Sequence, residues 1–431
     1  METPWESANG VQLQRFSRTE VRTHLKAISG RNVVLFDAGN HVNVRELFRN
    51  LRFAGVEPGR VTDVVLSHTH GDHIGGLSLF QNARLHSGGA TYEGTKLSFA
   101  GVNPNNPRGL LNGDPNLELV MTPGHQGPMD KTLIVRNAQK HSNVAFVGDL
   151  LNDERGIQAQ PDEQLSQQQF DSQKLILCDT SIDYILPGHG RIFRVTQAMR
   201  DRIGCFGSSS AGNRVGGGGN SVASLIRQLV TGTQATIGTP PSAFDFKGSC
   251  GLVISGPNVI VFDAGNHIDR SDLCRALSQG GVRPDRVTDV VLSHGHADHI
   301  GSISLFQRAA VHPGLVTYNG YRMTIGQLSP ATPSINFKND PNVQLLLTPG
   351  HEGPNDKSLI VRNAQTYGVI ALVGDLITDQ TDIRPVADAQ TTQEHVDSQR
   401  LIICDATIQY VLPGHGPIFQ VTAAIRTQMG C

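Results

Sequence analysis

Short apolar runs alternate with amphipathic segments along most of the chain. The apolar runs are three to seven residues long and rich in Val, Leu and Ile, which is typical of buried strands, whereas the amphipathic segments have helical spacing. Strands are predicted at residues 32–37, 61–67, 117–121, 132–135, 144–147 and 184–186, and helices at 43–54 and 163–178. Strands and helices that alternate in this way predict an α/β sandwich, in which helices cover paired sheets.

The second half of the chain repeats the pattern of the first half. Strands at residues 258–263 and 287–293 and a helix at 270–279 occupy the same places as 32–37, 61–67 and 43–54. We call residues at the same place in the two copies repeat mates. The 431 residues exceed what one ordinary core holds. The repeat therefore predicts two tandem domains, residues 1–205 and 227–431, joined by a Gly/Ser-rich linker at 206–226.

The two copies differ where each begins. Residues 248–254 are mostly apolar and predict a buried strand at the start of copy two. The matching residues 22–28 are far more polar. Copy one is therefore expected to have a frayed or remodelled first strand and to be the less securely folded half.

Composition and charge describe an ordinary globular protein. Apolar residues make up 38% and the net charge is −2, which gives no basic surface of the kind that binds nucleic acid. No apolar run reaches the about 18 residues of a membrane helix, and the first residues lack a signal-peptide pattern. Cys178 and Cys404 lie in apolar segments and are expected to be buried free thiols, which fits a reducing cytoplasmic or nuclear location without a membrane partner.

A six-residue block carries the chemistry of each copy. It reads His68-Thr69-His70-Gly71-Asp72-His73 in copy one and His294-Gly295-His296-Ala297-Asp298-His299 in copy two. Each block packs four metal-binding side chains into one loop, and imidazole with carboxylate suits Zn²⁺, with Fe or Mn as alternatives. Four more pairs of repeat mates keep the same spacing. They are Asp37 with Asp263, His125 with His351, Asp149 with Asp375, and His189 with His415.

These motifs, in this order, resemble the metallo-β-lactamase superfamily. The resemblance implies an αββα fold with two metals per domain and a hydroxide shared between them. It implies that His68, His70 and His125 hold one metal, that Asp72, His73 and His189 hold the other, and that Asp149 bridges them. In copy two the corresponding residues are His294, His296 and His351, then Asp298, His299 and His415, with Asp375 as the bridge. Asp72, Asp149, Asp298 and Asp375 are the catalytic candidates, and Asp37 and Asp263 are expected to brace the ligand loops.

The blocks around residues 66–80 and 185–195 resemble one subgroup of this superfamily more closely. That subgroup is associated with endonucleolytic processing of histone pre-mRNA 3′ ends, so the resemblance implies a zinc-dependent endoribonuclease. Two alternatives remain open, a thioester or lactone hydrolase with a small acyl substrate and a metal-binding scaffold with one silent copy. His41 with His267 and His86 with His312 repeat outside the motifs and are expected to be mainly structural. The two copies are expected to pack face to face as an intramolecular pseudo-dimer.

Overall fold

The structure is a computed structural model of the 431-residue chain. It describes residues 12–15, 25–29, 32–53, 55–99, 102–104, 106–138, 141–162, 165–205, 224–237, 243–388 and 391–431. Most of the linker predicted at 206–226 lies outside the described residues. Its last three residues belong to strand β14 (Ser224–Val230), so the predicted linker extended too far.

Copy one contains two sheets that face each other. The first has the order β1-β2-β3-β4-β5-β6-β7 before two further strands join it, and the second has the order β13-β12-β11-β10-β9-β8. The strands are β1 (Gln12–Arg15), β2 (Leu25–Ser29), β3 (Asn32–Phe36), β4 (Asp63–Val65), β5 (Arg84–Ser87), β6 (Ala90–Glu93), β7 (Lys96–Ser98), β8 (Arg108–Leu110), β9 (Leu117–Met121), β10 (Lys131–Ala138), β11 (Ser142–Gly148), β12 (Tyr184–Pro187) and β13 (Phe193–Arg194).

Copy two repeats this arrangement with sheets β14-β17-β18-β19-β20-β21-β22 and β23-β24-β25-β26-β27-β28. Its strands are β14, β17 (Cys250–Ser255), β18 (Asn258–Phe262), β19 (Asp289–Val291), β20 (Ala310–His312), β21 (Val316–Asn319), β22 (Arg322–Ile325), β23 (Ser334–Asn336), β24 (Val343–Leu347), β25 (Lys357–Ala364), β26 (Gly368–Gly374), β27 (Tyr410–Pro413) and β28 (Phe419–Gln420).

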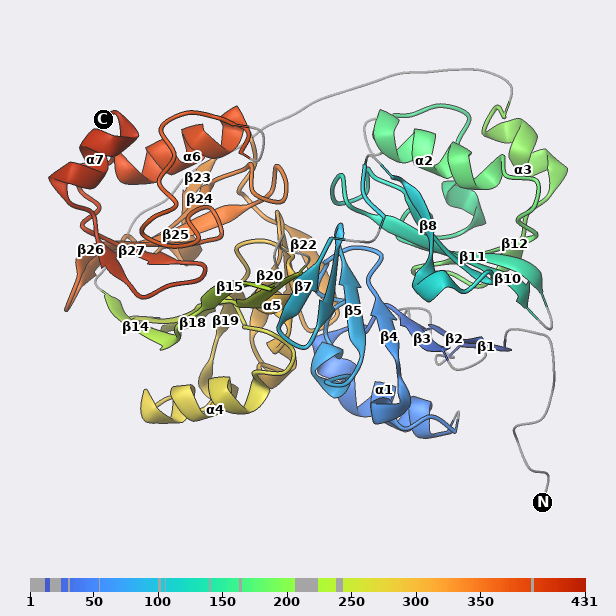
Figure 1. Ribbon diagram of the computed structural model, residues 1–431, viewed down its shortest axis with the longest axis horizontal. Helices are drawn as coiled ribbons and strands as arrows, with labels where there is room; N and C mark the ends of the chain where they lie inside the picture. Colours follow the sequence, from blue (N-terminus) through green and yellow to red (C-terminus); the bar gives the residue numbers. More distant parts are fainter. Residues whose placement is uncertain are drawn as a thin grey trace.

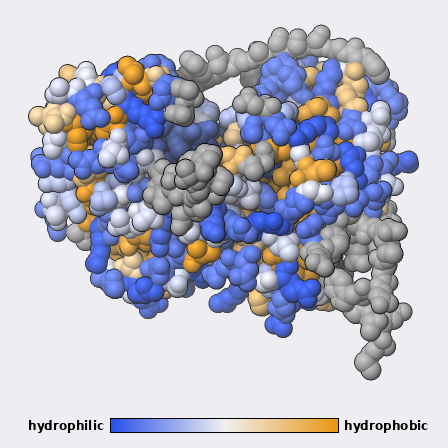
Figure 2. All heavy atoms as spheres, viewed as in Figure 1, coloured by the Kyte–Doolittle hydropathy of each residue, from blue (hydrophilic) through white to orange (hydrophobic). Residues whose placement is uncertain are grey.

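Helices cover the outer face of each sheet pair (Figure 1). On one side lie α1 (Val44–Phe53) and its counterpart α4 (Arg270–Gln279), and on the other lie α2 (Gln167–Leu177), α3 (Gln197–Arg202), α6 (Gln393–Ile403) and α7 (Ala423–Met429). A short helix, α5 (Ala297–Ile300), occurs in the ligand loop of copy two. The expected α/β class with two αββα sandwiches is confirmed. Hydrophilic residues cover most of the face shown in Figure 2.

Local sequence signals set the bounds of these elements. The predicted helix at 270–279 and the predicted strand at 117–121 match α4 and β9. Helix α2 begins at Gln167, later than predicted, because the Ser166 side chain caps it by accepting a hydrogen bond from Gln169 N–H. The polar start of copy one forms strand β2, which pairs with β3 along its whole length.

A hairpin from the second half of the chain extends the first sheet of copy one, which the sequence did not predict. Strands β15 (Thr233–Ile237) and β16 (Ala243–Lys247) pair with each other, and β16 also pairs with β7. Phe246 N–H donates to Thr95 O at 2.8 Å. With this hairpin, the first sheet of copy one has nine strands and contains residues from both halves of the chain.

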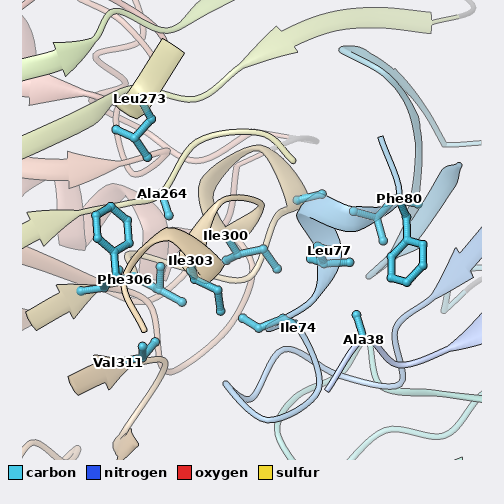
Figure 3. Packing of buried hydrophobic residues seen from close by; sticks show 14 of the residues in the cluster. Ala38, Ile74, Leu77, Phe80, Ala264, Leu273, Ile300, Ile303, Phe306 and Val311 are labelled. Carbon is cyan, nitrogen blue, oxygen red and sulfur yellow. The ribbon is translucent and has the colours of Figure 1, made fainter. Parts of the chain in front are cut away.

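The two copies also share a hydrophobic core. One cluster of buried residues includes Ile74 and Leu77 of copy one with Ile300 and Ile303 of copy two, and Figure 3 shows these side chains next to one another. Beside this cluster the hydroxyls of two repeat mates, Ser78 and Ser304, lie 2.5 Å apart. Arg270 Nη1 donates to both, at 3.3 and 2.6 Å. Apolar burial is therefore continuous across the boundary between the copies.

We expect the two copies to stay together in solution as an intramolecular pseudo-dimer, because separating them would expose this shared core. A compact particle of this length has a radius of gyration of about 22 Å. Small-angle scattering of the purified protein measures that radius directly. A larger value together with a two-bead distance distribution would contradict the expectation.

Each copy is closed by a disulfide near its end. Cys178 is joined to Cys205, and Cys404 is joined to Cys431, with Cα–Cα distances of 5.5 and 5.4 Å. The prediction of free thiols at Cys178 and Cys404 was therefore wrong. Both residues cap the C-terminal end of a long helix, and the short helix after it brings the second cysteine back to that end. The argument from free thiols for a reducing compartment falls with it. Among the described residues, none of the helices has the length and apolar character needed to cross a membrane.

Candidate metal centres

Parallel strands deliver the predicted ligands to one edge of each sheet pair. Strands β3 and β4 run parallel and end just before Asp37 and the His68 loop, and β11 and β12 run parallel and end just before Asp149 and His189. The carboxyl ends of parallel strands meet at the same edge, so these side chains converge although they are far apart in the sequence. His125 follows β9 and reaches the same edge.

Three histidines of copy one form the first ligand set. His68 Nε2 lies 3.0 Å from His70 Nδ1, and His125 Nε2 lies 3.1 Å from the same His70 atom. All three offer a ring nitrogen to one point, and these nitrogens lie within 4.8 Å of one another. The structure therefore brings together the three residues expected to hold the first metal.

Asp72, His73 and His189 form the second ligand set, and Asp149 lies between the two sets. His189 Nε2 is 3.2 Å from Asp72 Oδ2 and 3.0 Å from Asp149 Oδ2. Asp149 Oδ1 is 3.3 Å from His73 Nε2, while Asp149 Oδ2 is 3.7 Å from His125 Nε2 of the first set. One carboxylate thus reaches both sets, as expected of a bridging ligand.

Copy two places its seven candidates in the same arrangement. Asp375 Oδ1 is 3.0 Å from His299 Nε2, and Asp375 Oδ2 is 3.1 Å from His415 Nε2 and 3.5 Å from His351 Nε2. The clusters that can hold a metal ion are His294, His296, His351 and Asp375, and then Asp298, His299 and His415.

The donor atoms fit a divalent cation. Asp72 Oδ1, His73 Nε2 and Asp149 Oδ1 are buried without a hydrogen-bond partner, and so are His299 Nε2 and Asp375 Oδ1. A buried polar atom without a partner is costly, and a cation placed among these atoms would satisfy several of them at once. Sets of imidazole nitrogens with carboxylate oxygens match the preferences of Zn²⁺ and similar metals. The residues therefore fit two metals in each copy.

A buried aspartate holds each ligand loop in place. Asp37 accepts hydrogen bonds from Ser67 N–H at 2.7 Å and from the Ser67 hydroxyl at 2.8 Å, and its Oδ2 lies 2.8 Å from His73 Nδ1. Asp263 makes the same three contacts with Ser293 and His299. A carboxylate on Nδ1 fixes the ring orientation and leaves Nε2 free to face the metal position.

Glycines allow the last ligand loop to approach the bridging aspartate. A Cβ atom at Gly188 would lie 1.9 Å from Asp149 Oδ1, and one at Gly414 would lie 1.9 Å from Asp375 Oδ1. No side chain fits in that space. The glycine before His189 and the one before His415 are therefore required by the close approach of the backbone to the site.

Burial keeps the first ligand set neutral. It holds the pKa of His68 well below the ordinary value, with the neighbouring histidines adding to the effect, and it lowers the pKa of His70 to about 3. Burial also lowers the pKa of His125. A histidine binds a metal through an unprotonated nitrogen, so these three rings are ready to bind at neutral pH.

In the second ligand set, the pKa values of the histidines are raised instead of lowered. Burial disfavours the charged form of His73, but Asp149, Asp37 and Asp72 outweigh it and raise the pKa of His73 well above its ordinary value. In His189 burial is likewise outweighed, by hydrogen bonds to Asp149 and Asp72, which raise the pKa to about 9. In the metal-free protein these carboxylates therefore hold protons on both rings at pH 7.

Metal binding is expected to release protons from the second set. His73 and His189 must each lose a proton before binding a metal, so about two protons leave copy one at pH 7. The apparent metal affinity should rise as the pH increases toward about 9, where the pKa of His189 lies. Calorimetric titration with Zn²⁺ in buffers of different ionisation enthalpy measures the protons released. A titration that releases none would contradict this assignment.

The remaining repeated histidines lie outside the metal clusters. His86 Nε2 and His312 Nε2 contact Asp63 and Asp289 of the neighbouring strands, each at 2.9 Å. His41 and His267 are fully buried, and burial lowers the pKa of each to about 4. None of the four joins a ligand set.

Two tyrosines next to the ligand loops were missed by sequence reasoning. Tyr318 of copy two packs over the copy-one loop, where a Cβ atom at Gly71 would meet its ring at 3.1 Å, and its ring centroid lies 6.3 Å from that of His70. Its repeat mate Tyr92 is buried beside Asp298 of copy two. Their shared place in the repeat was the available signal, but only the packing of the copies shows that each tyrosine reaches the other copy's loop.

Most of the chain shows the sequence features of one family. The model of the metallo-beta-lactamase superfamily matches residues 27–189 and 243–418, which include every ligand position described above. The chain therefore belongs to the metallo-beta-lactamase superfamily, whose members are metal-dependent hydrolases.

Among its relatives is metallo-beta-lactamase domain-containing protein 1. The Xenopus laevis protein is 33% identical over 185 residues, which cover 41% of this chain and 74% of the relative. The Homo sapiens protein is 33% identical over 169 residues, which cover 38% of this chain and only 59% of the relative. The chain is also similar to the crystal structure of a quorum-quenching N-acyl homoserine lactone lactonase, at 17% identity and a TM-score of 0.33, over 46% of this chain and 93% of that one.

Proposed function

We propose that the protein is a dinuclear metal-dependent hydrolase that cleaves RNA phosphodiesters. The observation that carries the dinuclear site is Asp149, whose two oxygens face both ligand sets. Zinc is the metal that the donor set favours. The substrate class is supported by the resemblance of residues 66–80 and 185–195 to the subgroup associated with histone pre-mRNA 3′ ends.

The aspartates at each centre have different roles. Bound divalent metals supply Lewis acidity and lower the pKa of water to about 7. Asp37 orients His73 through Nδ1, so that Nε2 faces the site. The carboxylates of Asp149 and Asp72 lie 3.0 and 3.2 Å from His189 Nε2. Their negative charge attracts this ring and so holds it at the site. The same roles fall to Asp263, Asp375 and Asp298 in copy two.

The test is cleavage of a labelled histone-type pre-mRNA 3′ end by the zinc-loaded protein. We expect cleavage by the wild type and none by the double variant Asp149→Asn/Asp375→Asn, because both bridging carboxylates are removed. The metal content of each protein is measured in parallel.

The alternative function is hydrolysis of an acyl substrate, and the same test distinguishes it from RNA cleavage. The net charge of −2 fits a small substrate at least as well as a polyanion. If the metal-loaded wild type leaves RNA intact but hydrolyses a thioester or lactone, the RNA assignment is wrong. The proposal of a dinuclear centre would then be kept, with a thioester or lactone as its substrate.

A further inference from the structure

The two metal centres differ in how far solvent reaches their second ligand set. In copy one the side chains of His189 and Asp72 are 27% and 16% exposed. In copy two the side chains of the repeat mates His415 and Asp298 are 1% and 3% exposed. The same ligands are therefore open to solvent in one copy and enclosed in the other.

The first ligand set does not show this difference. His125 of copy one is 23% exposed and His351 of copy two is 22% exposed. In copy two, therefore, only the second ligand set is enclosed. Solvent reaches the first ligand set in both copies.

Residues 246–249, which we call the cover, enclose the second set of copy two. The ring of Phe246 packs at a tilt of 48° against the ring of His415, with centroids 4.9 Å apart. Lys247 O lies 3.0 Å from His415 Nδ1, and Ser249 N–H donates to Gly414 O at 2.7 Å. The chain passes so close that a Cβ atom at Gly248 would lie 2.3 Å from Asp298 O. The cover therefore contacts both loops that carry these ligands.

Two interactions hold the cover in place. It includes the last two residues of strand β16, which pairs with β7 of copy one. The Lys247 ammonium forms an ion pair with Asp269 at 3.0 Å. Sheet pairing on one side and an ion pair on the other fix its position over the centre.

The start of copy one is built differently. In copy two, strand β14 pairs with β17, and the β15–β16 hairpin and the cover follow before β17 begins. In copy one, strand β1 takes the place of β14 by pairing with β2. Residues 16–24 separate β1 from β2, whereas the longer stretch 231–249 separates β14 from β17, so the connection in copy one is shorter.

We propose that copy one is the centre at which a bulky, polymeric phosphodiester is hydrolysed, and that the cover restricts copy two to small molecules. This proposal rests on the proposed function, because it requires that the ligand sets of both copies bind metal. A phosphodiester within a polymer must lie across both ligand sets, with chain leaving on either side. Only copy one leaves both sets open.

The test is the rate at which metal leaves the full-length zinc-loaded protein when an excess of the chromogenic chelator 4-(2-pyridylazo)resorcinol is added. A chelator must reach the metal to remove it, so an enclosed ligand set loses metal slowly. We expect two resolved phases, a fast one from copy one and a slow one from copy two. Phe246→Ala should speed the slow phase and leave the fast phase unchanged. The matched control is Phe53→Ala, because Phe53 is 92% exposed on helix α1.

Three outcomes separate the ideas. Release of all bound metal in one phase, or a slow phase that Phe246→Ala does not change, overturns the inference. The milder variant Phe246→Leu is measured alongside, with circular dichroism, so that a folding defect in Phe246→Ala is recognised. A well-folded chain that binds no zinc contradicts the proposed function itself.

Discussion

Replacing His70 with alanine is expected to lower RNA cleavage by at least about a hundredfold, because residues that merely orient ligands already account for 10–100-fold in metal affinity or activity. His70 Nδ1 lies 3.0 Å from His68 Nε2 and 3.1 Å from His125 Nε2, so this ring completes the first set. The corresponding change His296→Ala should cause a smaller loss, because the cover already restricts copy two. Initial rates on the labelled RNA and zinc content per chain are measured for each variant and for the two combined.

A matched control is His141→Ala. His141 makes an edge-to-face contact with Tyr184, with ring centroids 4.9 Å apart, and belongs to neither ligand set. It should keep the wild-type rate and zinc content. Equal losses from His70→Ala and His296→Ala would show that both centres cleave RNA, and a larger loss from His296→Ala would assign the reaction to copy two.

Removing the disulfide of copy two is expected to destabilise it by about 3.5 kcal/mol, the loop-closure value for the sequence separation of 27 from Cys404 to Cys431. The bond ties the end of α6 to the last residue of the chain and so fixes α7 on the sheet. In the double variant Cys404→Ser/Cys431→Ser, the unfolded chain regains the freedom that the bond removes. Urea unfolding followed by circular dichroism gives the difference in free energy.

Cys274→Ser is the control for that experiment. Cys274 is a free, partly exposed thiol on α4, so its loss should change the free energy of unfolding little. Reducing agent should lower the wild-type midpoint toward that of the double variant. A midpoint that is the same with and without reducing agent would show that the bond does not contribute to stability.

The structure brings the predicted ligands together because they follow strands. His68, Asp149 and His189 each come directly after a short apolar run, and such runs form parallel strands whose carboxyl ends share an edge. Repetition of the same order in copy two made chance agreement negligible. The expected ligand sets are therefore brought together by local sequence and simple sheet geometry.

The disulfides could not be read from the same pattern. Cys178 sits among apolar residues, which is equally typical of a buried thiol. Pairing depends on how α3 packs back toward the end of α2, and side chains distant in sequence determine that packing. The hairpin β15–β16 was missed for a related reason, since its strands are short and β16 pairs with a strand of the other copy.

The sequence by itself determined the family, the duplication and the identity of the candidate ligands, because these depend on residue type and spacing along the chain. Only the tertiary structure decided how the copies share a core, which cysteines pair, and that the cover encloses His415 while His189 stays open. Those properties arise from contacts between segments far apart in the chain. Identical ligand motifs therefore specify the same metal chemistry twice, and the packing around them makes the two centres different.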